Sequence, residues 1–171
     1  ITFIILMTQM LPGAFLIIPI YFIFAWLKLT DTMLAIVIIN SAISTPIFIW
    51  FLKGFFDSIP MELEEAALVD GSTYLGAFVR IVLPIAAPGA LSTGLIAFIF
   101  SWNEFLFASV IATSSSTKTL PVGISEFITS FDIRWGEIMA LGTITTIPVI
   151  IFFILIQKYF VKGIMIGGVK E

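Results

Sequence analysis

The chain has 171 residues and a net charge of −3, with 60% apolar and 11% charged residues and a mean hydropathy of +1.17. These values are typical of a protein in a bilayer, not of a soluble domain. It contains no Cys and no His, which excludes disulfides, zinc sites, thiol catalysis and His-based acid–base chemistry in this chain. Its basic residues form no stripe that would indicate nucleic-acid binding. We therefore predict an all-α integral membrane protein without a metal site.

Four apolar stretches are long enough to cross a bilayer, which requires about 20 residues. The first is interrupted by Pro12, Gly13 and Pro19, so it should pack against protein or line a cavity, because lipid cannot satisfy the freed backbone groups. The second carries Asn40 and Ser44 near its middle, where polar groups either hydrogen-bond between helices or contact a solute. The four stretches cover about residues 3–25, 33–52, 87–113 and 138–159.

Three polar or amphipathic residues, Trp102, Asn103 and Glu104, follow one another in the outer half of the third stretch. A carboxylate in a membrane helix costs on the order of 2.5–3.5 kcal/mol at the bilayer centre and less near an interface. One hypothesis is that these residues line a translocation path. The alternative is a buried hydrogen-bond network between helices, or a carboxylate that reaches the interface.

Four spans place both chain ends and the loop 53–86 on one side of the membrane, and the loops 28–32 and 114–137 on the other. Within the second of these, residues 120–128 are expected to form a short helix. Basic residues favour the cytoplasmic face, and five of the eight lie on the first side. We therefore expect the loop 53–86 to be cytoplasmic. The five residues are Lys53, Arg80, Lys158, Lys162 and Lys170.

The cytoplasmic loop, residues 54–86, has the pattern of a helix-turn-helix. Ser58 can cap a first helix that has Pro60 in its first turn, and Gly71 can adopt the left-handed conformation that ends a helix. Ser72 or Thr73 can cap the second helix, which we expect to stop at Pro84.

The second helix of this loop has one apolar face, formed at helical spacing by Leu75, Phe78, Val79 and Val82. Such a face suits a groove on a partner protein. It equally suits a helix that lies on lipid headgroups. The spacing alone leaves both interpretations open.

The same loop matches the EAA motif of binding-protein-dependent ABC transporter permeases, which reads E-A-A, three residues, Gly, nine residues, I-x-L-P. The segments SWNEFLFA at 101–108, TLPVGI at 119–124 and the ending GGVKE resemble the carbohydrate-uptake branch, of the maltose-permease G subunit type. The motif residues are Glu65, Ala66, Ala67, Gly71, Ile81, Leu83 and Pro84, with Asp70 before the glycine.

Members of this family have six membrane helices, so the resemblance implies that the chain is a fragment with the last four. It implies one permease domain over residues 1–171, with a coupling loop at 54–86 and a cytoplasmic tail at 161–171. It also implies an importer in a bacterial-type inner membrane, built from a homo- or heterodimeric pair of permease subunits, a cytoplasmic ABC ATPase dimer and an extracytoplasmic solute-binding protein for sugars or related polyols.

In this family the EAA segment contacts the ATPase and the tail reaches the same interface, here through Gly167, Gly168, Val169 and Lys170. The sequence has no phosphate-binding G-x-x-x-x-G-K-[ST] motif, so we expect no enzyme activity and no bound cofactor in this chain, with ATP and Mg²⁺ held by the partner ATPases. The alternatives are a secondary transporter or channel domain, which also has broken helices, and a membrane-bound enzyme. Within the four stretches only Glu104 is acidic, which argues against an ion relay.

Overall fold

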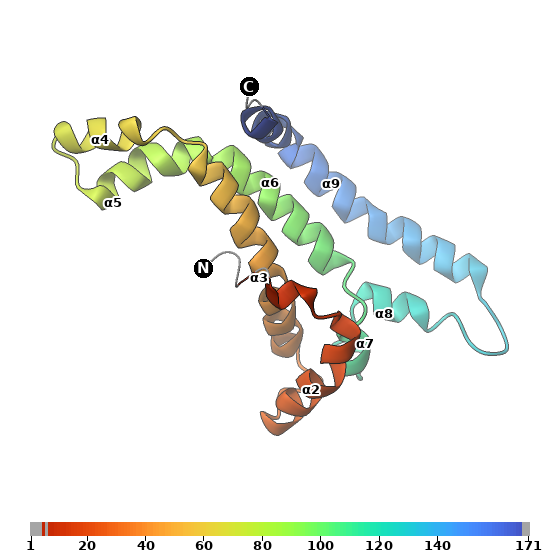
Figure 1. Ribbon diagram of the computed structural model, residues 1–171. Helices are drawn as coiled ribbons and strands as arrows, with labels where there is room; N and C mark the ends of the chain where they lie inside the picture. The colour runs from red at the N-terminus through yellow and green to blue at the C-terminus, as the bar shows by residue number, and fades with distance from the viewer. Residues whose placement is uncertain (1–4, 6, 169–171) are drawn as a thin grey trace. The chain divides into compact units, whose positions relative to one another are not determined.

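The computed structural model describes residue 5 and residues 7–168, with side chains up to residue 157. Helices make up its regular structure (Figure 1), apart from one isolated bridge between Ile128 and Ile133. The prediction of an all-α membrane protein is confirmed. The helices are η1 (Thr8–Met10), α2 (Gly13–Trp26), α3 (Met33–Asp57), α4 (Met61–Val69), α5 (Tyr74–Ala77), the π-helical turn η2 (Phe78–Val82), α6 (Leu83–Trp102), α7 (Ala108–Ile111), α8 (Leu120–Ser125) and α9 (Trp135–Gly168).

Three helical stretches within the described residues are long and apolar enough to cross a membrane: Met33–Asp57, Tyr74–Trp102 and Trp135–Gln157. The first predicted stretch is shorter than expected, because Pro12 is extended at φ −61° and ψ 129° and the helix α2 starts only at Gly13. Its 14 residues continue through Pro19. Among the described residues, three of the four predicted stretches thus contain a helix long enough to span a bilayer, and the first contains the shorter apolar helix α2.

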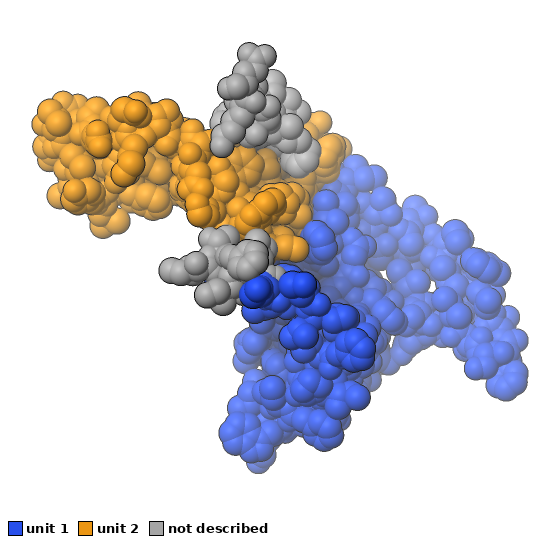
Figure 2. Space-filling view, in the orientation of Figure 1, with its two compact units in different colours: residues 1–46, 98–151 blue, residues 47–97, 152–171 orange. Residues whose placement is uncertain are grey.

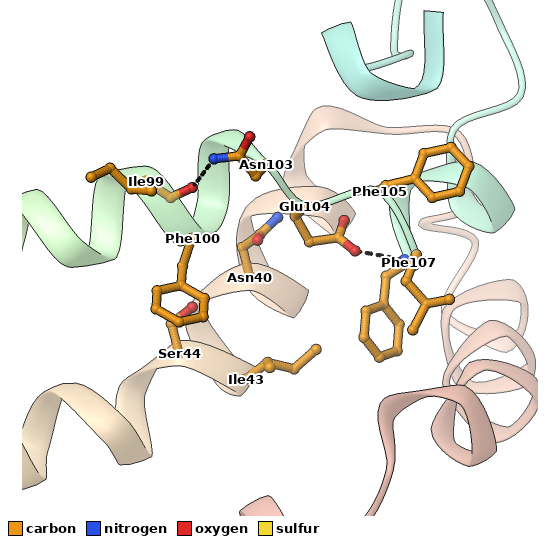
Figure 3. Close-up of a pocket in the computed structure, with 10 residues that line it drawn as sticks. Asn40, Ile43, Ser44, Ile99, Phe100, Asn103, Glu104, Phe105 and Phe107 are labelled. Carbon is orange, nitrogen blue, oxygen red and sulfur yellow. Dashed lines mark hydrogen bonds between the residues drawn. The ribbon is translucent and has the colours of Figure 1, made fainter. Parts of the chain in front are cut away.

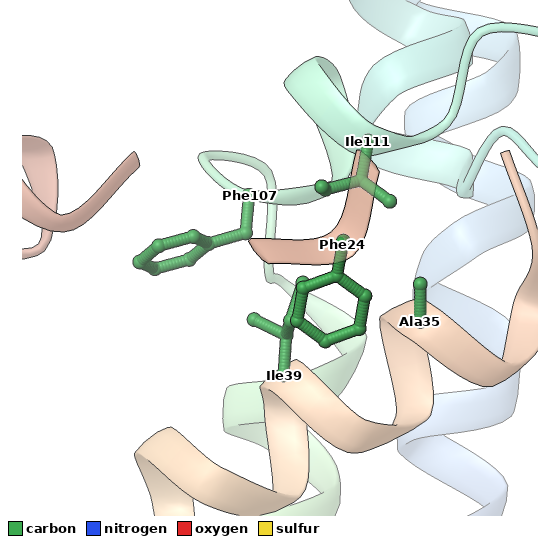
Figure 4. Packing of buried hydrophobic residues seen from close by; sticks show 5 residues of the cluster. All are labelled: Phe24, Ala35, Ile39, Phe107 and Ile111. Carbon is green, nitrogen blue, oxygen red and sulfur yellow. The ribbon is translucent and has the colours of Figure 1, made fainter. Parts of the chain in front are cut away.

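The chain divides into two compact units (Figure 2), residues 1–46 with 98–151 and residues 47–97 with 152–171. The first unit has a small apolar core at which α2, α3 and α7 meet (Figure 4). Phe107 and Ile111 lie four residues apart and so point to one side of α7. The buried side chains of this core are Phe24, Ala35, Ile39, Phe107 and Ile111.

The second unit brings the last turns of α3 against the first turns of α6. Gly89 lies at this contact, because a Cβ placed there would be 2.2 Å from Cγ of Phe55. Ser92 and Thr93, on the next turn, are buried, and their hydroxyls donate to the carbonyls of Pro88 and Gly89 at 2.8 and 3.0 Å. Small residues whose hydroxyls bond within their own helix let two membrane helices approach closely.

The sequence predicted that the helix after Thr73 stops at Pro84, but the helix continues past this residue. It runs without a break from Tyr74 to Trp102. A proline inside an α-helix lacks an N–H and clashes with the carbonyl four residues earlier, here that of Arg80. The wider π-helical turn η2 includes Arg80 and ends at Val82, which accommodates the proline, since such turns relieve local disruptions of the hydrogen-bond ladder.

The ends of the remaining elements also differ from expectation. The third predicted stretch reached residue 113, whereas α6 ends at Trp102. The short helix expected within 120–128 is α8, which ends at Ser125. The last helix was expected to end near residue 159 before a separate tail, but α9 continues to Gly168, so most of the predicted tail is helical.

Candidate functional site

The segment that follows α3 forms a helical hairpin whose tight turn is centred on Gly71. The backbone N–H of Gly71 donates to the carbonyl of Leu68, and that of Ser72 donates to the carbonyl of Ala67, both at 3.0 Å. This pair of bonds is the Schellman arrangement, in which the residue after the helix takes a left-handed conformation. Gly71 has φ +86°, as the sequence predicted.

The second helix of the hairpin is capped by Thr73, whose hydroxyl accepts from the N–H of Gly76 at 3.1 Å. Of the two caps considered, Thr73 is therefore the one formed. The cap expected from Ser58 is not formed, because its hydroxyl donates back to the carbonyl of Phe55 at 2.7 Å. The first helix begins at Met61, with Pro60 as its N-terminal flanking residue.

The hairpin packs against the end of α3 through stacked aromatic rings. Its own helices also contact each other. Phe56 and Phe78 stack with ring centroids 6.1 Å apart, and α4 contacts both α5 and η2. Ala67 and Ala77, one on each helix of the hairpin, are buried. The hairpin is therefore connected to two long helices, through the Phe56 ring to α3 and through a continuous backbone to α6.

The predicted coupling residues divide into a buried group and an exposed group. Ala67 is buried and Ile81 is half-buried, so these two hold the hairpin together. The remaining six are exposed on its surface: Glu65, Ala66, Asp70, Gly71, Leu83 and Pro84.

Three apolar side chains next to the turn are not part of the motif, yet they are largely exposed. Val69, Tyr74 and Leu75 are 88%, 74% and 72% exposed. Val69 and Tyr74 lie two and three residues from Gly71 in the sequence. Apolar residues this close to a tight turn were the signal that could have identified them as surface residues of the hairpin tip. They give the tip of the hairpin an apolar surface.

A cavity of about 540 Å³ lies within the first unit and is lined mainly by apolar side chains. Figure 3 shows side chains from α3 and from the end of α6 around it. Four of the five residues proposed for a translocation path line this cavity: Asn40, Ser44, Asn103 and Glu104. The structure thus brings together polar groups that lie some 60 residues apart in the sequence.

The two asparagines of the cavity bond within their own helices. Asn40 Nδ2 donates to the carbonyl of Ile36 at 3.1 Å, and Asn103 Nδ2 donates to that of Ile99 at 2.8 Å. These bonds do not join one helix to another. Hydrogen bonding between helices, one of the two roles considered for Asn40, is therefore not made by its Nδ2 group. Each amide also carries an oxygen that can accept a hydrogen bond.

Glu104 acts as a cap for the short helix α7. Its Oε1 accepts from the backbone N–H of Phe107 at 2.7 Å, and its Oε2 accepts from that of Ala108 at 3.0 Å. A carboxylate at this end of a helix satisfies N–H groups that have no partner inside the helix. Glu104 therefore shapes the cavity wall as well as lining it.

We expect Glu104→Ala to loosen α7, at a cost of about 0.5–2 kcal/mol, the usual range for the loss of a helix cap. Hydrogen exchange at the Phe107 and Ala108 amides should then be faster than in the unsubstituted protein. Glu104→Gln keeps one acceptor oxygen, so its exchange rates should lie between those of the unsubstituted protein and Glu104→Ala. Solute affinity and ATPase stimulation at the level of the unsubstituted protein in Glu104→Ala would limit this residue to a scaffold role.

Trp102 lines a second cavity of about 340 Å³ in the same unit, with residues of α8 and with Thr145. One face of its indole stacks on Phe98 at a centroid distance of 5.3 Å. Its Nε1 donates to the carbonyl of Thr145, on α9, at 3.2 Å. Trp102 thus joins the end of α6 to α9 and is separate from the larger cavity.

The remaining predicted positions are those at the end of the chain. Gly167 and Gly168 form the last described residues of α9, while Val169 and Lys170 lie outside the described residues. Among the residues that the structure describes, no group of three or more acidic, Cys or His side chains could hold a metal ion.

Comparison with known proteins identifies the family. The family model described as "Binding-protein-dependent transport system inner membrane component" matches residues 1–166. The chain is 37% identical to the inner membrane ABC transporter permease protein YcjP of Escherichia coli (strain K12), over 94% of the chain and 58% of the relative. It is 35% identical to the diacetylchitobiose uptake system permease protein DasC of Streptomyces coelicolor, over 96% and 60%.

A third relative is the trehalose/maltose transport system permease protein MalG of Thermococcus litoralis, 40% identical over 73% of the chain and 45% of the relative. The chain thus spans about half the length of the curated relatives it matches.

Proposed function

Because the chain belongs to the family of binding-protein-dependent transport system inner membrane components, we propose that it forms the later part of the permease subunit of an ATP-driven importer. The match over residues 1–166 is the observation that carries this proposal. In this role residues 1–171 are part of a single permease domain. The subunit catalyses no reaction itself, and hydrolysis takes place on the partner ATPases.

The hairpin with its tip at Gly71 is the coupling element in this proposal, and it faces the cytoplasm. Its support is physical. The turn is fixed by two backbone bonds, the side chains of Glu65 and Ala66 are exposed, and the tip is apolar at Val69, Tyr74 and Leu75. A groove on an ATPase subunit would cover these side chains, and closure of the ATPase dimer would then move α3 and α6 together.

The two cavities of the first unit form part of the solute path. A sugar needs hydrogen-bonding groups set in a largely apolar lining. The 540 Å³ cavity has this character, with Asn40, Ser44, Asn103 and Glu104 among apolar neighbours, and Trp102 borders the smaller one. The printed names of two relatives refer to diacetylchitobiose and to trehalose and maltose, so we assign sugars or related polyols as the solute class.

The importer requires partners that this chain does not contain. They are a second permease subunit, identical or different, a dimer of ABC ATPases that binds ATP and Mg²⁺, and an extracytoplasmic solute-binding protein. The end of the chain, Gly167, Gly168, Val169 and Lys170, is proposed as a further contact with the ATPase.

The solute class is tested on the cognate solute-binding protein, which carries most of the selectivity. A panel of mono-, di- and oligosaccharides and polyol phosphates is screened by thermal shift against that protein. Saturable stabilisation by one carbohydrate, together with co-purification of the full-length subunit with an ABC ATPase, is the expected result. Amino acids and divalent metal ions are screened beside this panel, and stabilisation by these alone would contradict the sugar assignment. Failure to co-purify with an ATPase would contradict the importer.

A further inference from the structure

The turn between α2 and α3 has an uncommon backbone conformation. Lys28 and Asp31 have φ values of 56° and 58°, in the left-handed region that residues with a side chain seldom adopt. The next residue, Thr32, caps α3, since its hydroxyl accepts from the N–H of Ala35 at 3.2 Å. The N–H of Asp31 donates to the carbonyl of Ile111 at 2.9 Å. A conformation of this kind persists only where surrounding contacts impose it.

The carboxylate of Asp31 supplies these contacts. Its Oδ1 accepts from the backbone N–H groups of Thr113 and Ser114, both at 2.9 Å, and from the Ser114 hydroxyl at 3.0 Å. The hydroxyl of Thr117, which is 7% exposed, donates to the same oxygen. We call this group, Asp31 with Thr113, Ser114 and Thr117, the latch.

The latch is held by a charged acceptor. The backbone N–H of Ser114 and then the hydroxyl of Thr117, with smaller contributions from the Ser114 hydroxyl and the Thr113 N–H, hold the pKa of the Asp31 carboxyl well below its usual range. The group is therefore ionised throughout the physiological pH range. Hydrogen bonds to an ionised acceptor are about twice as strong as neutral ones.

The latch lies between the elements that form the two cavities. The turn that it holds follows α7 directly, and Ile111 of α7 is part of the buried core with Phe24. The same turn leads into α8, whose Leu120 and Pro121 line the smaller cavity with Trp102. Phe107, just before α7, lines the larger one. A single carboxylate thus fastens the segment that joins both cavity walls.

We propose that Asp31 is a positioning residue for solute delivery, which fastens the 113–117 turn to the α2–α3 turn so that α7 and α8 hold the cavity walls in one arrangement. This inference rests on the proposed importer function. By the order of the spans, both turns lie on the side of the membrane opposite to the 53–86 loop, where the solute-binding protein delivers its solute.

The test uses the full-length subunit in the assembled transporter, reconstituted in proteoliposomes. ATPase activity is measured as a function of the concentration of solute-loaded binding protein. We expect Asp31→Ala to raise the concentration that gives half-maximal stimulation by about tenfold, as the loss of a charge-assisted network implies, while basal ATPase activity stays unchanged. The half-maximal concentration for Asp31→Asn should lie between those of the unsubstituted protein and Asp31→Ala. Ser115→Ala, an exposed neighbour outside the latch, should behave as the unsubstituted protein.

A covalent replacement separates positioning from general folding. Asp31 and Ser114 are in side-chain contact, with Oδ1 and Oγ 3.0 Å apart. In a full-length subunit whose native cysteines, if any, are replaced by serine, Asp31→Cys with Ser114→Cys replaces the latch by a disulfide, and thiol titration first establishes that this bond has formed. Stimulation should be restored under oxidising conditions and lost again with reductant, whereas neither single variant should respond to reductant.

Three outcomes would overturn the inference, and the third is distinguishable from the first two. A responsive unsubstituted transporter with the same half-maximal concentration in Asp31→Ala would overturn the latch alone, as would a defective Asp31→Ala that the disulfide does not rescue. An unsubstituted complex that gives no response to loaded binding protein would overturn the importer, and the latch with it.

Discussion

Replacing Gly71 with leucine is expected to abolish solute uptake while the subunit still inserts into the membrane. Gly71 has φ +86°, and a residue with a Cβ pays about 1–2 kcal/mol to remain in the left-handed conformation. A Cβ there would meet no atom within 4 Å, so the effect comes from the backbone and not from a clash. The turn would relax and misdirect Glu65 and Tyr74, which lie on either side of it.

The size of the effect should follow the tolerance of each residue for this conformation. Asn, which adopts it more readily than other residues with a side chain, should retain part of the activity, and proline, whose φ is fixed near −65°, should retain none. Gly54→Leu is the matched control, because Gly54 lies inside α3 without a positive φ and with nothing within 4 Å of a Cβ. Uptake is measured with labelled solute, and insertion by membrane fractionation. Normal uptake by Gly71→Leu would refute the coupling role of this turn.

Replacing Gly89 with alanine is expected to disrupt the packing of α6 on α3. The added Cβ would lie 2.2, 2.3 and 2.7 Å from the ring atoms Cγ, Cδ1 and Cδ2 of Phe55. Because Cγ is the ring atom nearest to the backbone, rotation of the ring does not remove the conflict and the helices must separate. Overpacking of this kind costs about 1–3 kcal/mol.

The matched control for Gly89→Ala lies five residues further along the same helix. A Cβ at Gly94 meets no atom within 4 Å, so Gly94→Ala should leave stability unchanged or raise it slightly. The thermal stability of the purified full-length subunit in detergent distinguishes the two. In a Phe55→Ala background, which lacks the Cγ atom, Gly89→Ala should cost much less stability than it does beside Phe55. Equal stability of Gly89→Ala and Gly94→Ala would show that α3 and α6 are not in close contact at this point.

Local chemistry made the hairpin at Gly71 predictable. A glycine at the required position, a hydroxyl residue after it and acidic residues at the start of the first helix each favour one backbone conformation, whatever the rest of the chain does. The Gly71 turn and the Thr73 cap were therefore correctly placed. Ser58 was not, because its hydroxyl had two possible partners and the carbonyl of Phe55 competes with the next helix.

The predicted end of the helix at Pro84 was wrong because the backbone can accommodate a proline without ending the helix. Proline in a helix usually marks its end, but a π-helical turn just before it offers a second solution, in which the helix widens and continues. Nothing in the residues 78–82 distinguishes the two outcomes, because Phe, Val, Arg and Ile occur in both. The continuous helix from Tyr74 to Trp102 matters, since it joins the hairpin to the membrane without a flexible break.

The cavity and the latch depend on contacts between residues far apart in the chain. Asn40 and Glu104 were each singled out as polar groups in apolar stretches, but their common cavity follows from helix packing that one sequence does not reveal. Asp31 was missed because an acidic residue in a short polar turn has no pattern of its own. Its partners lie in the segment 113–117, where the run of Ser and Thr offered many donors without indicating an acceptor.

Transport by the reconstituted full-length complex is the decisive measurement for the proposed ATP-driven importer. Proteoliposomes that contain the subunit, its partner permease and its ATPases are supplied with labelled solute, with and without ATP inside and with and without the solute-binding protein outside. We expect the solute to accumulate above its external concentration only when ATP and the binding protein are both present. Accumulation driven by an imposed ion gradient without ATP would contradict it and would indicate a secondary transporter.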